Sequence, residues 1–211
     1  MKKITAIRIG RGRKKRVNIL LDGKFAFSLE AEVAVREGLK VGQELKNSQI
    51  EVITRSDQYH RCLNAAAHYL SYRPRSEFEL RGRLHRRGFD DNSVDGVITK
   101  LKEQGLVNDI AFAQFWKENR QSFNPRSQRL TGVELRQKGV ASDIVDQVVN
   151  DADDDDSAFR AAQGKAWGLS LSDYRNFRNR LSEYLRRRGF DYGVINRTVE
   201  RLWQERGEKS G

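Results

Sequence analysis

The chain has 211 residues, 37% of them hydrophobic, with 40 Lys and Arg against 29 Asp and Glu. This composition can bury cores, and no apolar run approaches the roughly 20 residues of a membrane helix, so a membrane protein is excluded. The net charge of +11 favours an anionic partner, of which nucleic acid is the commonest in a cytosol.

The first residues, "MKKITAIRIG", have no continuous apolar segment and no small-residue cleavage site, so we predict no secretion signal. The single cysteine, Cys62, cannot form an internal disulfide, which is typical of a reducing cytosol. Its neighbours Leu63, Ala66 and Ala67 indicate a partly buried thiol rather than a nucleophile. We therefore expect a cytoplasmic protein.

Residues 1–57 are predicted to form a small β-rich domain. "ITAIRIG" and "RVNILLDGKFAFSL" read as strands, and Asp22-Gly23 within the second segment is a strong hairpin signal because both turn positions must tolerate positive φ. "EAEVAVREGL" predicts a short helix that Gly38 ends, and "VGQEL" then returns to extended chain.

The loop between the first two predicted strands, "RIGRGRKKR", has six basic residues among nine positions. Like charges crowded on one loop repel unless a polyanion neutralises them, so the loop is either a solvated hairpin tip or a polyanion contact. Gly10-x-Gly12 is no dinucleotide-binding motif, because no third glycine follows and a strand comes next. The candidate binding residues of this loop are Arg11, Arg13, Lys14, Lys15 and Arg16.

Three later segments repeat one pattern: "HRRGFDDNSVDGVITKL", "RQKGVASDIVDQVV" and "RRRGFDYGVINRTVERL". They align on Gly88, Gly139 and Gly189, which are 51 and 50 residues apart, with a leucine four residues before each glycine. Each glycine is expected just past a helix end, where the chain needs a left-handed residue. A period near 50 residues built from whole helices indicates a helical repeat.

The helix after each glycine should be amphipathic, with one apolar stripe facing the core. In the first copy the stripe is Val94, Val97, Ile98 and Leu101. Side-chain oxygens near the start of this helix are available in each copy, from Asp90, Ser142 and Asp191.

The helix before each glycine also has start signals. Ser76 with Glu79 forms a capping box, and Ser127 holds the equivalent position in the second copy. Pro74 and Pro125 precede these caps and end the preceding helices. In the third copy, which lacks both residues, we expect Ser172 to cap a longer helix with the apolar stripe Tyr174, Phe177, Leu181, Tyr184 and Leu185.

Leading helices are predicted over residues 60–72, 109–122 and 157–167. The fold class is therefore mainly α, with three tandem three-helix repeats forming an elongated curved body behind the small β-rich domain, because one three-helix module buries little alone. The predicted repeats are residues 58–107, 108–152 and 153–211, the last with a short polar C-terminal tail.

"PRSEFELRGRLHRRGF", "VITKLKEQGLVNDIAFAQFW" and "GVELRQKGV" resemble the RecX family of bacterial recombination regulators. The likeness covers roughly residues 60–203, is looser in the third repeat, and "VGQEL" looks like the N-terminal extension of longer members. The resemblance implies a RecA partner: such proteins lodge in the groove of the RecA–DNA filament and restrain its growth, ATP turnover and strand exchange.

Cationic side chains recur around the helix that precedes each glycine. Clusters at a regular interval could track DNA phosphates or acidic patches along a filament, and arginine binds either group bidentately. For the residue directly before each glycine, the helix macrodipole is an alternative explanation. The candidate partner-binding residues are Arg73, Arg75, Arg81, Arg83, Arg86, Arg87, Arg126, Arg129, Arg136, Lys138, Arg175, Arg178, Arg180, Arg186, Arg187 and Arg188.

The run "DADDDD" at residues 151–156 is the one dense acidic segment. An exposed acidic linker that leads into a helix start is the simplest interpretation. A metal site is disfavoured because the EF-hand glycine and closing glutamate are missing. A third interpretation is an internal competitor that masks the arginine clusters until a polyanion displaces it.

No enzyme motif is present: there is no G-x-S-x-G and no P-loop, and His60, His68 and His85 lack zinc-site spacing. We expect no catalytic residue, metal or cofactor, and a monomer. The main alternative function is a helical protein that binds single- or double-stranded DNA non-specifically, since the modules resemble helix-turn-helix units but offer few base-reading side chains. An adaptor for another protein complex also fits the repeats.

Overall fold

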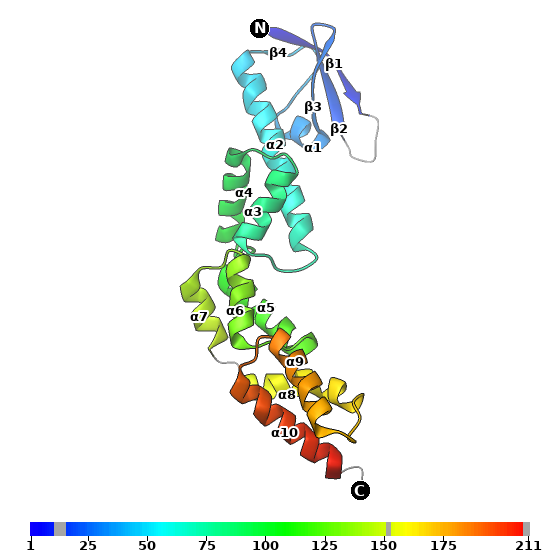
Figure 1. Cartoon of the computed structure of the whole chain (residues 1–211). Coiled ribbons are helices and arrows are strands. Elements are labelled where there is room, and N and C mark those ends of the chain that lie inside the picture. Colours follow the sequence, from blue (N-terminus) through cyan, green and yellow to red (C-terminus); the bar gives the residue numbers. More distant parts are fainter. Residues whose placement is uncertain (11–15, 151–152, 209–211) are drawn as a thin grey trace. The chain divides into compact units, whose positions relative to one another are not determined.

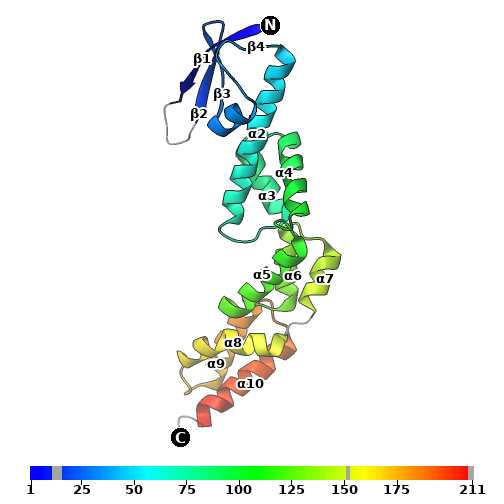
Figure 2. The same cartoon turned by 180° about the vertical axis from the view of Figure 1, so that it is seen from behind.

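The computed structural model describes residues 1–10, 16–150 and 153–208, and the chain divides into two compact units. Figures 1 and 2 show the described elements from opposite sides. The candidate residues Arg11, Arg13, Lys14 and Lys15 lie outside the described residues. Unit 1 contains Met1–Arg73 and Leu80–Leu106, and unit 2 contains Pro74–Glu79 and the residues from Val107 onward.

Unit 1 begins with an antiparallel sheet in the strand order β3-β2-β1-β4. The hairpin between β2 and β3 turns at Asp22 and Gly23, whose φ values are +48° and +80°. Both turn residues are therefore left-handed, as the hairpin signal predicts. The strands are β1 (Lys2–Ile9), β2 (Arg16–Leu21), β3 (Lys24–Glu30) and β4 (Glu44–Leu45).

The short predicted helix is α1 (Ala31–Arg36), and Gly38 follows it with a φ of +61°. One core joins the sheet, α1 and the start of α2 (Asn47–Leu70). Its most deeply buried members include Ile4, Ile19, Leu29, Val33 and Leu45. The predicted small β-rich domain is confirmed.

The first leading helix is longer than predicted: α2 begins at Asn47, not at residue 60. The Gln49 side chain accepts the backbone N–H of Lys46 at 2.8 Å and satisfies one of the free donors of the first turn. Neither glycine nor proline interrupts residues 47–70, so the helix runs through the predicted boundary after residue 57. α2 therefore contributes Ile53 to the sheet core and Cys62 to the first module.

The first module consists of α2, α3 (Glu77–Arg86) and α4 (Asp91–Glu103). α4 packs on α2, and Asp90 caps α4 by accepting the backbone N–H of Ser93 at 2.7 Å. The predicted stripe of α4 is buried, which confirms the helical period: Val94, Val97, Ile98 and Leu101.

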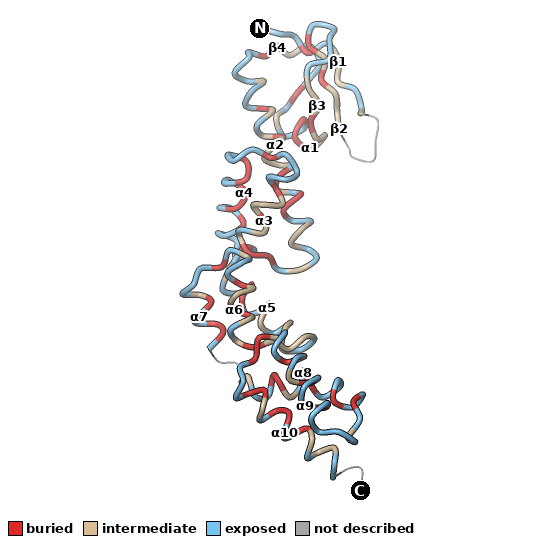
Figure 3. Tube along the Cα trace, in the orientation of Figure 1, coloured by how far each residue is buried: buried red, intermediate tan, exposed pale blue. Residues whose placement is uncertain are grey.

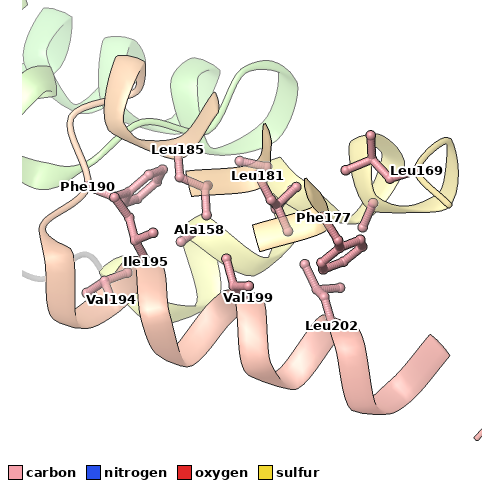
Figure 4. Packing of buried hydrophobic residues seen from close by; sticks show 13 residues of the cluster. Ala158, Leu169, Phe177, Leu181, Leu185, Phe190, Val194, Ile195, Val199 and Leu202 are labelled. Atoms are coloured by element: carbon pink, nitrogen blue, oxygen red, sulfur yellow. The ribbon is translucent and has the colours of Figure 1, made fainter. Parts of the chain in front are cut away.

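Unit 2 contains two further three-helix modules, each with its own hydrophobic core. In the last module, Leu181 and Leu185 of α9 (Tyr174–Arg187) converge with Ile195 and Val199 of α10 (Tyr192–Glu208) (Figure 4). The helices of the second module are α5 (Asp109–Phe123), α6 (Gln128–Gln137) and α7 (Ser142–Val149). Those of the third are α8 (Asp154–Trp167), α9 (Tyr174–Arg187) and α10 (Tyr192–Glu208).

The middle helices α3, α6 and α9 end in the same way. Gly88, Gly139 and Gly189 have φ values of +86°, +77° and +87°. The residue after each glycine donates its backbone N–H to the carbonyl of the leucine five positions earlier, at 3.3, 3.1 and 3.4 Å. This is the hydrogen bond of a Schellman motif, and its recurrence confirms the predicted repeat.

One predicted helix cap is wrong. Ser172 does not cap α9; Asp173 does, accepting the backbone N–H groups of Arg175 and Asn176 at 2.8 and 3.2 Å, because a carboxylate one residue later reaches these donors. Ser142 lies at the start of α7, as predicted, but it is the first helical residue, and Ala141 at the cap position offers no side-chain oxygen.

The helices bury one side only. Figure 3 shows buried and exposed stretches alternating along the helices of each unit. On α9, the buried residues Phe177, Leu181 and Leu185 recur at helical spacing, and the remainder of the helix surface is largely exposed. The middle helices therefore keep a solvent-facing side on which charged residues can meet a partner.

Candidate binding surface

Nine of the candidate arginines are exposed, and all lie on or directly after the middle helices α3, α6 and α9. The other described candidates are partly or fully buried. The exposed ones are Arg86, Arg87, Arg129, Arg136, Arg175, Arg178, Arg180, Arg186 and Arg187.

α9 has the highest density of exposed arginines. Arg175, Arg178 and Arg186 follow one another at three and eight residues, a spacing that places them within one stripe of an α-helix. This stripe lies beside the buried side and not on it, since Phe177, Leu181 and Leu185 form the core contact. The three arginines therefore lie along one edge of α9, named here the α9 arginine stripe, and Arg178 also donates to the Tyr192 hydroxyl at 3.3 Å.

Some exposed arginines have exposed acidic partners. Arg136 contacts Asp146 at 2.7 Å, with both side chains about half exposed or more. Arg187 contacts Glu183 at 2.6 Å one helical turn away. Exposed pairs of this kind stabilise a protein by about 0–1 kcal/mol, so an anionic partner can replace the acidic residue at little cost.

Arg126 has a structural contact inside the second module. Its guanidinium pairs with Glu134, which also accepts Trp116 Nε1–H at 2.8 Å and Arg120 Nε–H at 2.7 Å. The Glu134 side chain is only 12% exposed, so this carboxylate neutralises two partly buried cations. Arg126 therefore contributes to folding and not to the exposed surface.

The cations directly before the glycines of unit 2 join neighbouring modules. Lys138 donates to Glu79 at 2.8 Å and lies 4.2 Å from the ring centre of Trp116. Arg188 donates to Asn124 at 3.2 Å and stacks on Tyr184. Both side chains reach back to residues of the preceding repeat, which the macrodipole explanation did not anticipate.

Four other candidates are shielded from solvent to different degrees. Arg16 donates to the Ser28 carbonyl and contacts Asp57 at 3.3 Å, so it holds β2 near β3 and α2. Arg75 is buried, and Arg73 is half-buried. The half-buried Arg83 has its guanidinium 5.4 Å from the Tyr69 ring.

Arg81 is also half-buried and contacts Asp95 of α4. The side chain of Asp95 is 62% exposed, so the pair lies at the surface of the first module. Arg81 therefore belongs with the surface-paired arginines, although it is less accessible than those of α9.

The junctions between modules use the same backbone contacts twice. Glu77 and Gln128, at the starts of α3 and α6, donate their backbone N–H groups to Asp109 and Asp154 at 2.9 and 2.8 Å. These carboxylates belong to the first residues of α5 and α8, the leading helices of the following repeats. The two aspartates lie 32 and 26 residues after their donors, so no regular spacing in the sequence marks this contact.

The capping serines complete the same junctions. Ser76 Oγ donates to the Lys138 carbonyl at 2.6 Å, and the backbone N–H of Ser127 donates to the Arg188 carbonyl at 3.0 Å. Each carbonyl directly precedes a left-handed glycine, so successive repeats meet at that turn. The turns that follow α6 and α9 are therefore contact points with the preceding repeat.

The described part of the acidic run is the start of α8. Asp153 caps this helix, and Asp155 forms two hydrogen bonds with Arg197, both at 2.8 Å. Hydrogen bonding from Arg197 lowers the pKa of Asp155, whereas burial raises that of Asp154. Asp156 contacts Arg160 at 2.9 Å, so the run pairs locally with cations outside the candidate set.

Chemically reactive groups are few. The Cys62 thiol is fully buried, and burial raises its pKa to about 11, which keeps it protonated and unreactive near neutral pH. His60 contacts Arg36, and His85 lies 3.7 Å from Asp91. Within residues 1–10, 16–150 and 153–208, no group of three or more His, Cys, Asp or Glu side chains could hold a metal ion.

Among the described helices, none is both long and apolar enough to cross a membrane.

Models of the RecX family match three parts of the chain: the regulatory protein RecX N-terminal domain matches residues 2–46, the first three-helix domain residues 62–101 and the third three-helix domain residues 153–199.

Curated relatives named regulatory protein RecX match over almost the whole chain. The protein from Clostridium perfringens is 31% identical over 96% of this chain and 97% of its own, and that from Bacillus velezensis is 32% identical over 98% and 80%. A crystal structure of regulatory protein RecX covers 95% of this chain and 100% of its own with a TM-score of 0.64 and 26% identity. The RecX structure from Lactobacillus salivarius, with a TM-score of 0.60 over 70% of this chain and 97% of its own at 24% identity, shares the fold.

Proposed function

The chain belongs to the RecX family of regulatory proteins, and from this premise we propose that it binds the RecA recombinase filament and inhibits filament growth, ATP turnover and strand exchange. It acts in the cytoplasm as a monomer that needs no cofactor. The filament is a polymer, and a chain of tandem modules can meet successive subunits of a polymer with successive modules.

The α9 arginine stripe carries this proposal. Arg175, Arg178 and Arg186 are exposed, lie on one side of a rigid helix, and each has a planar guanidinium that binds carboxylate or phosphate bidentately. Arg129 and Arg136 are exposed on α6 of the preceding module, so cations recur on the middle helices. A repeated cationic surface of this kind fits a long anionic lattice.

Sequence-specific DNA reading is disfavoured by the same structure. In a helix-turn-helix protein the last helix of the unit reads base edges with polar side chains. Here α7 directs Val145, Val148 and Val149 into its module, and α10 directs Val194 and Ile195 into its own. Non-specific DNA binding, without recombinase regulation, is the alternative function.

The first test is the DNA-dependent ATPase of a cognate RecA with increasing amounts of this protein. We expect inhibition at substoichiometric to equimolar amounts, because a regulator that binds a filament acts on many subunits. Affinity for naked DNA is measured in parallel by fluorescence anisotropy. If about six to ten phosphates are neutralised, that affinity falls by about a thousandfold or more between low and moderate salt.

The salt series separates two kinds of contact. Inhibition that persists after DNA affinity is lost assigns the cations to acidic patches of RecA, and inhibition that falls in parallel assigns them to DNA. Absence of ATPase inhibition at equimolar protein, with DNA binding intact, would reject the proposal in favour of non-specific DNA binding.

A further inference from the structure

A cavity of about 460 Å³ lies in unit 2, between the end of α5, one side of α8 and the end of α9. Its volume is in the range of about 300–1,000 Å³ that small-ligand sites commonly have. Three of its lining residues are the cations Arg160, Lys165 and Arg188. Among the described residues, none that lines this cavity is acidic.

Arg188, one of the two arginines that line the cavity, is held in a defined orientation. The guanidinium carbon of Arg188 lies 3.9 Å from the centre of the Tyr184 ring, and its Nη2 donates to Asn124 at 3.2 Å. The Tyr184 hydroxyl in turn donates to the Ala161 carbonyl at 3.1 Å. A fork fixed by stacking loses less conformational entropy when it binds an oxyanion than a free side chain does.

The other two cations differ in how far they are engaged. Arg160 contacts Asp156 at 2.9 Å and the Gln121 carbonyl at 3.2 Å. Lys165 is exposed, and its ammonium forms no hydrogen bond or ion pair within the described part of the chain. The cavity therefore has an excess of positive charge that its own lining does not neutralise.

An aromatic ring stands at the cavity beside these cations. Phe123, the last residue of α5, lines the cavity and is 83% exposed. Exposing a phenyl ring to water is unfavourable. In known complexes, stacking of a base on an aromatic ring adds about 1–3 kcal/mol to the binding free energy, as measured by replacing the aromatic residue with alanine, whichever base is present.

The repeat provides an internal comparison. Equivalent positions of the two leading helices can be counted from the first aspartate of each helix. The positions seven and eleven residues after it are Trp116 and Arg120 in the second module, and Ala161 and Lys165 in the third. Five residues before the glycine stands Glu134 in the second module and Tyr184 in the third.

These exchanges remove a carboxylate from the equivalent place in the third module. Glu134 neutralises the cations around it, whereas the third module has lost this carboxylate and replaced tryptophan by alanine. Within the described residues, Arg188 and Lys165 have no carboxylate partner and can bind an external anion, whereas Arg160 pairs with Asp156.

We propose that this cavity binds a nucleotide unit, with its phosphate on Lys165, Arg188 and Arg160 and its base stacked on Phe123. Planar forks and an ammonium suit a phosphate that carries up to two charges, and the ring beside them suits a base. The nucleotide is either free or part of a single strand. The inference concerns a site apart from the α9 arginine stripe and does not depend on recombinase regulation.

The test compares Gly164→Glu with Gly164→Gln. Gly164 lines the cavity within α8, and a Cβ at this position would meet no heavy atom within 4 Å, so both variants should fold. Replacing a glycine inside a helix also removes its entropic penalty. The two side chains have nearly the same size, so a difference between the variants reports the added negative charge alone.

Binding of a fluorescein-labelled oligothymidine and of a fluorescent nucleoside triphosphate is measured by anisotropy at low salt. We expect Gly164→Glu to bind at least about tenfold more weakly than Gly164→Gln, because a carboxylate near the phosphate repels it. Phe123→Leu should weaken oligothymidine binding by about fivefold or more, with Phe25→Leu on β3 as the control for losing an exposed phenylalanine.

The outcomes separate the ligand sources. Charge-sensitive binding of oligothymidine alone identifies a nucleotide within a strand, and charge-sensitive binding of both probes identifies a free nucleotide as well. Equal affinities of the two Gly164 variants, or failure of the unmodified protein to bind either probe, would overturn the proposal. Tighter binding of an oligoglutamate peptide than of both nucleotide probes would also overturn it. None of these readouts contains recombinase, so their failure leaves the proposed regulation untouched.

Discussion

Gly189→Ala is expected to destabilise unit 2 by about 3 kcal/mol or more, whereas Gly88→Ala should destabilise unit 1 by only about 1–2 kcal/mol. Both glycines end a middle helix with nearly the same φ, +87° and +86°, so the left-handed strain of an alanine is the same. Only Gly189 is crowded: an added Cβ would lie 2.6 Å from Ser127 Oγ and 2.7 Å from Leu130 Cβ.

The difference arises from the junction between modules. At Gly88 an added Cβ meets no heavy atom within 4 Å, and at Gly139 it would overlap the Phe78 Cβ. Gly139→Ala should therefore resemble Gly189→Ala. These glycines are needed both for their backbone conformation and for the close approach of the preceding repeat.

Urea denaturation gives the free energy of unfolding for each variant. Circular dichroism follows the whole chain, and tryptophan fluorescence reports unit 2, which contains Trp116, Trp167 and Trp203. A loss at Gly189 no larger than the loss at Gly88 would show that the junction is not close-packed in solution.

Glu134→Ala is expected to destabilise unit 2 by about 3 kcal/mol, because it leaves two partly buried cations without their counter-ion. The side chains of Arg120 and Arg126 are 22% and 29% exposed. The variant also removes the acceptor of Trp116 Nε1–H, which an alanine cannot replace.

Glu183→Ala is the matched control for Glu134→Ala. Glu183 also pairs with an arginine, Arg187, but their side chains are 56% and 64% exposed, so the change should be within about 1 kcal/mol. Urea denaturation monitored by tryptophan fluorescence measures both variants. Similar losses for the two would mean that the network around Glu134 is solvated and adds little to stability.

The fold was largely predictable because its signals are local. A glycine that ends a helix, an apolar residue after it and a stripe at helical spacing all lie within about 20 residues, so three near-copies reinforce one another. The start of α9 was predicted one residue too early: Ser172 was expected to cap the helix, and the adjacent Asp173 does so. The start of α2 was missed because Lys46 is not a usual capping residue.

The role of individual cations was less predictable, because it depends on contacts between distant residues. Lys138 meets Glu79 across 59 residues, and Arg16 meets Asp57 across 41. Sequence spacing predicted that these cations would be available to a partner, whereas the fold gives them internal acids. Exposed stripes such as Arg175 and Arg178 could be predicted, since their helix has a clear apolar side that excludes them.

The most direct measurement is inhibition of RecA ATPase by two variants that each lose three positive charges. One removes the α9 arginine stripe through Arg175→Gln, Arg178→Gln and Arg186→Gln. The control removes three exposed cations of unit 1 through Lys24→Gln, Lys40→Gln and Arg55→Gln. We predict that the concentration for half-inhibition rises by about tenfold or more for the first variant and by less than about twofold for the control. Equal inhibition by both folded variants would contradict the assignment of this surface.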